Sequence, residues 1–247
     1  MTDARGEPVT GLTRADFTIE EDGTPQAIRT FVAGEFPLAV AVGLDRSFSV
    51  PRDRLAAAAA AARSFVDRLR PADQVMVLAI GSEVEIVAPL SATHSAAISA
   101  LGAIEPWGTT PLYDATLKAL DAIQSASGRR ALILLSDGED RYSETHAETL
   151  LAEARRRDVL VYPVSTGRKR PELFAELAAV TGGRSFHAVE RRDLEATLAT
   201  IARELRQQYL LGYTPTAGDG KRGWRSIHVS VSRPDARVRA RDGYFLN

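Results

Sequence analysis

Between residues 36 and 208, short apolar runs alternate with longer amphipathic segments, and this alternation limits the fold more than any other feature of the chain. Residues 37–44 form a nearly continuous apolar run, which is typical of a strand buried on both faces. The alanine-rich segment 52–69 that follows has the periodicity of a helix with one apolar side. Strands that alternate with helices form a parallel sheet with helices on both faces. The sequence therefore predicts an α/β fold with a doubly wound, mostly parallel sheet.

The same periodicities give six strands and six helices for this region. The expected strands cover residues 37–44, 74–80, 84–87, 131–135, 159–164 and 185–189, with 84–87 near the sheet edge. The expected helices cover residues 52–69, 95–104, 111–126, 145–157, 172–180 and 194–207. Thr145 and Glu148 have the spacing of a capping box at the start of the fourth helix. Gly182 and Gly183 are expected to end the fifth.

Both ends of the chain have the alternation of β-strands. In residues 1–35, the hairpin pair Asp22-Gly23 joins Phe17–Glu20 to a returning strand over 27–31. In residues 209–247, a strand over 226–232 is followed by a turn at Pro234-Asp235 and a second strand over 237–241. Each end is too short to hold a core alone. We therefore expect 1–35 and 209–247 to pack together as a small β-rich companion to the domain 36–208.

Charge and composition exclude several classes of partner and chemistry. The 31 basic and 32 acidic side chains give a net charge of −1, which offers no footprint for nucleic acid or for an anionic membrane. The longest apolar runs are too short for a transmembrane segment. The absence of cysteine removes disulfides, thiol nucleophiles and thiolate metal sites.

The first residues carry no signal peptide, because Met1 leads directly into a polar, turn-rich segment. Two expectations fit this start equally: a cytoplasmic protein, or a fragment of an exported protein whose leader has been removed.

Oxygen-bearing side chains gather where the predicted strands end. Asp45, Ser47 and Ser49 follow the first strand, Asp137 follows the fourth, and Thr110 lies in a loop ahead of a helix. In a doubly wound sheet, ligands bind at the carboxyl ends of the strands, near the point where the strand order reverses. Residues two apart in an extended loop project to the same side, so these five side chains are expected to converge.

Such a donor set suits a hard cation. Mg²⁺ takes oxygen ligands, and two aspartates would neutralise its double charge, while the three hydroxyls add neutral oxygens. We therefore expect Mg²⁺ as the cofactor, with Mn²⁺ or Ca²⁺ as alternatives. A cation surrounded mostly by hydroxyls stays electrophilic and keeps a position free. It would accept one more carboxylate, from an Asp or Glu of a partner protein.

The pattern Asp45-x-Ser47-x-Ser49, Thr110, and Asp137 within Ser-Asp-Gly resembles the metal-ion-dependent adhesion site of von Willebrand factor A domains. The resemblance covers residues 36–208 in the order and separation of the motifs. It implies a Rossmann-like sheet with helices on both faces and a protein-binding function. It also implies that the five residues ligate the metal, some of them through water.

The terminal segments are similar to a bacterial group of these proteins that is well represented in Acidobacteria. The motifs are Gly11-Leu12-Thr13-x-x-Asp16-Phe17, Glu21-Asp22-Gly23-x-Pro25-Gln26, Tyr209-x-Leu211-Gly212-Tyr213 and Arg241-Asp242-Gly243-Tyr244. This likeness implies export or a place in the cell envelope. Phe48 and Val50 stand where the group usually has Gly and Met, and Trp107 stands where a second glycine is frequent. These departures affect the stiffness and polarity of the loops and remove no ligand.

Each of these residues could also have a purely structural role. Ser49 and Thr110 each precede a helix and could cap it, and Asp137-Gly138 could be an ordinary turn. Glu139, Asp140 and Glu144 form an acidic cluster that is expected to be mainly solvated. Phe48, Trp107 and Tyr142 could form an aromatic rim beside the metal, although simple loop packing explains them as well.

We therefore expect a metal-dependent protein-binding module and not an enzyme. One alternative is a Mg²⁺-dependent phosphoryl-transfer or hydrolase domain in which Asp45 is the nucleophile. Such sites gather more acidic residues near the first strand and an opposing lysine, whereas Lys118 lies well along a helix. No Gly-x-Ser-x-Gly elbow or phosphate-binding glycine loop is present, and the four histidines are scattered. A further alternative is a scaffold subunit of a cell-envelope assembly, which differs only in its partner.

Overall fold

The computed structural model describes residues 1–215 and 222–246. Two compact units make up this chain. One contains Pro37–Ala202, and the other combines Met1–Phe36 with Arg203–Asn247, so that its two segments come from opposite ends of the sequence. The boundary lies inside one helix, six residues before the position 209 expected from the sequence.

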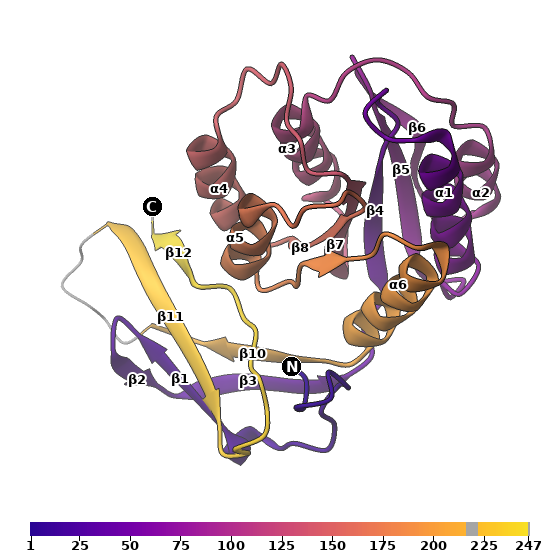
Figure 1. Ribbon diagram of the computed structural model, residues 1–247. Helices are drawn as coiled ribbons and strands as arrows, with labels where there is room; N and C mark the ends of the chain where they lie inside the picture. Colours follow the sequence, from indigo (N-terminus) through magenta and orange to yellow (C-terminus); the bar gives the residue numbers. More distant parts are fainter. Residues whose placement is uncertain (216–221, 247) are drawn as a thin grey trace. The chain divides into compact units, whose positions relative to one another are not determined.

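Pro37–Ala202 is built on a six-stranded sheet, as predicted (Figure 1). Its strands are β4 (Leu38–Asp45), β5 (Gln74–Ile80), β6 (Val84–Ser91), β7 (Arg129–Ser136), β8 (Leu160–Ser165) and β9 (Phe186–His187), in the order β6-β5-β4-β7-β8-β9. All neighbours are parallel except β5 and β6, which form an antiparallel edge. The α/β class and the mostly parallel sheet are confirmed.

Helices cover both faces of this sheet. They are α1 (Arg52–Val66), α2 (Ser95–Gly102), α3 (Leu112–Ile123), α4 (Ala147–Arg156), α5 (Glu172–Thr181) and α6 (Arg191–Arg206). In Figure 1, α1 and α2 lie on one face, and α3, α4 and α5 lie on the other. Every residue of β4 is buried, because this central strand has helices on both sides. On the α3–α5 face, for example, Ala41 and Leu132 pack against Leu120 and Leu177.

The sheet grows in both directions from β4. The chain passes from β4 to β5 on one side, and later returns to place β7 on the other side. The strand order therefore reverses between β4 and β7. A crevice at the carboxyl ends of these two strands is the position at which folds of this kind bind ligands.

Three local predictions in this unit need correction. The capping box at Thr145 and Glu148 is wrong: α4 begins after His146, and the backbone N–H of Thr145 donates to the carboxylate of Asp114 instead. The edge strand β6 is twice as long as the expected 84–87, because pairing with β5 extends it to Ser91. β9 is limited to Phe186–His187, since only two of its residues pair with β8.

The second unit contains two antiparallel sheets. One has the order β12-β11-β1-β2, with β1 (Phe17–Glu21), β2 (Thr24–Gln26), β11 (Gly223–Val231) and β12 (Gly243–Leu246). The other pairs β3 (Ile28–Gly34) with β10 (Gln208–Tyr213). Asp22 and Gly23 both have positive φ, as the predicted hairpin requires.

Two strand predictions in this unit are wrong. The strand that returns from the hairpin is β2, whereas residues 28–34 leave this sheet and pair with β10. No strand forms over 237–241. Arg237 makes an isolated bridge to Thr2, and β12 pairs with β11 further along the chain.

Side chains from both ends of the chain meet in this unit. Phe17, Phe31 and Tyr209 form an aromatic cluster with ring centroids 5.0–6.0 Å apart. The carboxylate of Glu21 accepts hydrogen bonds from the hydroxyls of Tyr213 at 2.5 Å and Tyr244 at 3.0 Å. Burial and the bond to Glu21 raise the pKa of Tyr213 well above its usual value. Because Glu21, Tyr213 and Tyr244 lie on β1, β10 and β12, this contact connects the two sheets.

We predict that Tyr213→Phe destabilises the unit formed by the two chain ends. The substitution leaves the buried Glu21 carboxylate with one donor fewer, which costs about 1–2 kcal/mol. Hydrogen exchange of β10 and β11 should accelerate accordingly, while exchange of β4 and β7 stays unchanged. Tyr142→Phe removes the same hydroxyl from a side chain that is 81% exposed, and serves as the control. Equal exchange in both variants would show that the contact with Glu21 contributes nothing.

Candidate functional site

Asp45 is the last residue of β4 and lies at the point where the strand order reverses. Its side chain is only 2% exposed. One carboxylate oxygen, Oδ1, accepts the backbone N–H of Ser47 at 3.0 Å. The other, Oδ2, accepts the hydroxyl of Ser136, the last residue of β7, at 2.6 Å. The carboxylate therefore joins the ends of the two strands that flank the crevice.

The loop after β4 presents its hydroxyls together. The Oγ atoms of Ser47 and Ser49 are 3.0 Å apart, so the two side chains point toward the same place. Ser47 is buried, whereas Ser49 is exposed. The loop closes on itself through a hydrogen bond from the N–H of Val50 to the carbonyl of Ser47. The side chains of residues 47 and 49 therefore project to the same side of the loop, as expected from their spacing of two residues.

Backbone hydrogen bonds tie three loops together around this point. The N–H of Phe48 donates to the carbonyl of Gly108 at 3.0 Å, which connects the β4–α1 loop to the loop before α3. The N–H of Arg141 donates to the carbonyl of Thr110 at 2.7 Å, which connects the same loop to the one after β7. Thr110 is 1% exposed and lies between these two links. The three segments that carry the predicted residues therefore meet at one edge of the sheet.

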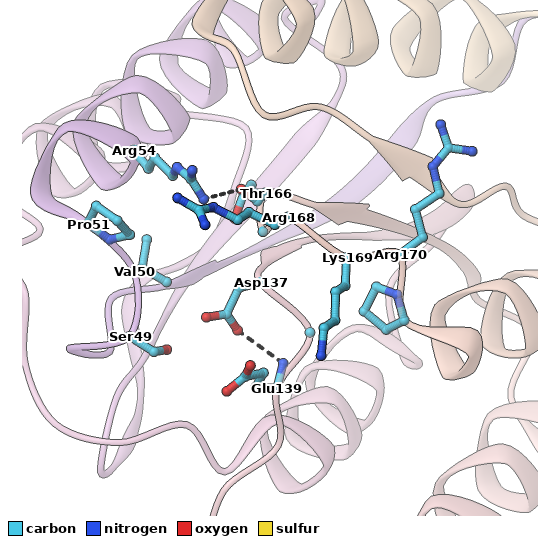
Figure 2. A pocket seen from close by; sticks show the side chains of 13 residues that line it. Ser49, Val50, Pro51, Arg54, Asp137, Glu139, Thr166, Arg168, Lys169 and Arg170 are labelled. Atoms are coloured by element: carbon cyan, nitrogen blue, oxygen red, sulfur yellow. Dashed lines mark hydrogen bonds between the residues drawn. The ribbon is translucent and has the colours of Figure 1, made fainter.

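Asp137 follows β7 directly and is half-buried. Its Oδ1 accepts the N–H of Glu139 at 3.0 Å, which shapes the start of the loop. Gly138 has φ +83°, and a Cβ at this position would come within 2.0 Å of Pro171. A glycine is required here, because the loops after β7 and β8 pack against each other. Asp137 and Ser49 line the same pocket (Figure 2).

Burial dominates the electrostatics of the site. It raises the pKa of Asp45 from 3.8 to about 6, although the hydrogen bonds from Ser136 and Ser47 act in the opposite direction. The negative charge of Asp137 raises the pKa further, so the two aspartates are close enough to repel each other. A buried carboxylate with a like charge beside it and no cationic partner is unfavourable in isolation. A divalent cation would remove both penalties.

Other residues take the capping roles that could have explained the serine and the threonine. The first N–H groups of α3, at Tyr113 and Asp114, donate to the hydroxyl of Ser143, and Tyr113 also donates to Asp140. The residue before α1 is Pro51, which makes no side-chain cap, and the hydroxyl of Ser49 contacts Ser47 instead. The hydrogen bonds that hold these helix starts therefore do not account for Thr110 and Ser49.

The acidic cluster divides by role. Asp140 is part of the cap of α3, and Glu139 pairs with Arg141 at 2.8 Å. The backbone N–H of Glu144 donates to Asp114 at 2.9 Å. Glu139 and Glu144 are exposed, as expected for a mainly solvated cluster, whereas Asp140 is half-buried and holds the start of α3.

The aromatic rim also divides. Phe48 and Tyr142 are 73% and 81% exposed. Trp107 instead stacks on the guanidinium of Arg46, with 5.1 Å from the Arg46 Cζ to the ring centroid. Packing on Arg46 therefore accounts for part of Trp107, which is still 41% exposed, while Phe48 and Tyr142 are more fully available at the surface.

The donor set fits a hard cation. Across residues 1–215 and 222–246, no three side chains of His, Cys, Asp or Glu form a group that could hold a metal. A cation at this edge would therefore depend on the hydroxyl oxygens of Ser47, Ser49 and Thr110 beside the carboxylates of Asp45 and Asp137. All five donors are oxygens, the ligand type of Mg²⁺. In the same described residues, no helix is long and apolar enough to cross a bilayer.

Sequence reasoning missed two features of the site. Ser136 had no assigned role, although its hydroxyl donates to Asp45 and accepts the N–H of Gly138 at 3.0 Å. The pocket beside Asp137 also carries Arg54, Arg168 and Lys169. The run Arg168-Lys169-Arg170 was a visible signal, since only two residues separate it from the carboxyl end of β8 in the same sheet.

Comparison with known proteins agrees with this architecture. Residues 40–139 match the family model described as the von Willebrand factor type A domain. A UPF0353 protein of Mycobacterium leprae is 23% identical over 215 residues, covering 75% of this chain and 62% of the relative. The chain thus spans less than two thirds of the length of this relative.

Two solved structures share the fold. The von Willebrand factor type A protein from Catenulispora acidiphila has a TM-score of 0.57 and 20% identity, covering 77% of this chain and 50% of that one. The von Willebrand factor domain of the type V pili tip protein Mfa5 from Porphyromonas gingivalis has a TM-score of 0.57 and 12% identity, covering 69% and 95%. At these identities the likeness extends to the fold alone. The narrower bacterial group suggested by the terminal motifs stays a prediction.

We predict that Asp45→Asn stabilises the metal-free protein at neutral pH. Because the folded state raises the pKa of Asp45 to about 6, it binds the proton more tightly than the unfolded state does. The stability that this group contributes is full below pH 4 and is lost as the pH rises through 6. With chelator present, the variant should exceed the wild type by up to roughly 3 kcal/mol at pH 7.5, and the difference should shrink at pH 5.

Chemical denaturation at the two pH values measures this difference. Glu176→Gln removes an exposed carboxylate from α5 and serves as the control. A wild type that is as stable as Asp45→Asn at pH 7.5 would contradict an uncompensated charge at position 45.

Proposed function

We propose that Pro37–Ala202, which has the fold of a von Willebrand factor A-type domain, is a metal-dependent protein-binding module. In this proposal Asp45, Ser47, Ser49, Thr110 and Asp137 hold one Mg²⁺. An Asp or Glu of a partner protein completes its coordination. When bound, the cation supplies a Lewis-acidic position that accepts this carboxylate.

The observation that carries the proposal is the convergence of these residues at the reversal of strand order. The negative charge of Asp137 acts on the buried carboxylate of Asp45, and the hydroxyls of Ser47 and Ser49 are in contact. Hydrogen bonds from Phe48 and Arg141 tie the loop of Thr110 to both neighbouring loops. These hydrogen bonds position the loops without a ligand, which lowers the cost of binding a cation.

The surface around the site suits a protein partner. Phe48 stands between the two serines and Tyr142 lies on the loop after β7, and both rings are exposed. Exposed aromatic side chains near the centre of an interface often supply much of its binding energy. The solved domain of similar fold in a pilus tip protein supports a surface role. The alternative of a scaffold subunit in a cell-envelope assembly uses the same metal chemistry and differs only in its partner.

The geometry argues against the phosphoryl-transfer alternative. The side chain of Asp45 is only 2% exposed, which limits the access of a phosphoryl group to its carboxylate. The amine of Lys118 donates to the carbonyl of Val84 in the edge strand. It therefore does not oppose Asp45, as the lysine of such an enzyme would. We propose a binding function without catalysis.

We predict that the protein binds Mg²⁺ and Mn²⁺ and that Asp45→Ala abolishes this binding. Calorimetric titration and the shift in melting temperature with added cation measure it, because a ligand that binds only the folded state raises stability. Asp137→Ala should weaken binding at least about tenfold, since it removes one of the two charged donors. Glu176→Ala should bind as the wild type does. Equal binding in Asp45→Ala and wild type would sink the proposed site.

We also predict that Asp45 is not phosphorylated. After incubation with Mg²⁺ and acetyl phosphate, intact mass and acid–base lability should reveal no acyl phosphate in the wild type. An adduct that appears in the wild type and disappears in Asp45→Asn would instead establish the enzymatic alternative.

A further inference from the structure

A basic pocket adjoins the proposed metal site. It has a volume of about 560 Å³ and is lined by residues from the start of α1, the loop after β7 and the loop after β8. Arg54, Arg168, Lys169 and Arg170 contribute four positive charges, whereas Asp137 and Glu139 contribute two negative ones. Glu139 is already paired with Arg141. This local excess of positive charge occurs in a chain whose net charge is −1.

The positive side chains have no carboxylate partner. Arg168, Lys169 and Arg170 are exposed, and none of them, nor Arg54, forms an ion pair with the residues that the structure describes. Figure 2 shows the guanidinium groups of Arg54 and Arg168 on the side of the pocket opposite Asp137 and Glu139. Arg170 extends away from the pocket. Arg54, Arg168 and Lys169 therefore form the part of the pocket that can bind an anion.

The backbone that carries these side chains is fixed on several sides. The N–H of Thr166 donates to the carbonyl of Ser136 at 2.8 Å, and the carbonyl of Thr166 accepts from the guanidinium of Arg54 at 3.2 Å. The hydroxyl of Ser165 donates to the carbonyl of Lys169 at 2.7 Å. The Nε2 of His187 lies 2.8 Å from the carbonyl of Gly167. The loop is thus held in place while its charged side chains project from it.

We infer that this pocket binds a second acidic side chain of the same partner, so that the ligand is a short acidic segment of protein with two or more neighbouring carboxylates. The inference rests on the proposed function for the first carboxylate. Asp137 and Ser49 lie on the wall that the pocket shares with the metal site. A segment with one carboxylate at the cation would place its next residues within reach of Arg54, Arg168 and Lys169. Bidentate pairing of a guanidinium with a carboxylate would then fix the orientation of the segment.

A nucleic acid fits this surface less well. Asp137 and Glu139 line the same pocket as the basic side chains, and they would repel a continuous phosphate backbone. A peptide can place neutral residues beside these carboxylates and acidic residues beside the arginines.

Binding of a fluorescein-labelled decaglutamate peptide in the presence of Mg²⁺ tests the inference. We expect Arg168→Gln/Lys169→Gln to bind it about tenfold more weakly than the wild type, because two charge pairs are lost at the pocket rim. Arg68→Gln/Arg70→Gln removes the same charge after α1, near the amino end of β5 and hence at the opposite edge of the sheet, and should bind as the wild type does. Lys169→Gln alone provides a smaller loss if the double variant unfolds.

Three outcomes would overturn the inference. The peptide binds the two double variants equally, the wild type does not bind it, or a decathymidylate binds as tightly with the same dependence on Arg168 and Lys169. Asp45→Ala separates this inference from the proposed function. If Asp45→Ala still binds the peptide and this binding still depends on Arg168 and Lys169, the inference about the pocket is supported and the metal-dependent function is refuted. If Mg²⁺ binds normally but the affinity for the peptide is the same in the pocket variants as in the wild type, only the inference about the pocket is refuted.

Discussion

The buried carboxylate of Asp45 is the interaction on which the candidate site depends. It receives a hydrogen bond from its own loop, through the N–H of Ser47, and another from the end of β7, through Ser136. These two bonds fix the loop after β4 relative to the neighbouring strand. Burial makes the charge costly, because the site supplies hydroxyl and amide dipoles and no opposite charge. A site with an uncompensated buried negative charge is unfavourable without a ligand and suits a small divalent cation.

In the loops around Asp45, some residues hold the structure together and others are exposed to a partner. Ser143 and Asp140, which lie far along the chain from α3, hold the start of that helix and so leave Thr110 outside the cap. Carbonyl groups of Gly108 and Thr110 accept hydrogen bonds from the loops on either side. The side chains of Phe48, Tyr142, Arg168 and Lys169 point outward from this framework. The contacts that make the site rigid are therefore different from those available to a partner.

The sequence predicted the elements of Pro37–Ala202 well, because the apolar periodicity of strands and helices is local and strong. β5 agrees with its prediction in full, and the loops that carry Asp45 and Asp137 follow the strands where expected. Predictions failed where distant residues decide the outcome. The cap expected at Thr145 is replaced by Asp114, and the strand expected over 237–241 is displaced by β12. The sequence places the run Arg168-Lys169-Arg170 at the carboxyl edge of the sheet, but it does not show that Arg54 from the start of α1 lines the same pocket.

Gly138 limits how this surface can change. A side chain there would collide with Pro171, and one at Gly108 would collide with the backbone of Ser82, where the nearest atom would be 2.4 Å away. The glycines that anchor the loops therefore tolerate little variation. The neighbouring positions 139, 141, 142 and 168–170 carry exposed side chains. Substitutions at these exposed loop positions could change the preferred ligand during evolution while the sheet and the anchoring glycines stay the same. Recognition and folding would then evolve under separate constraints within a few residues of each other.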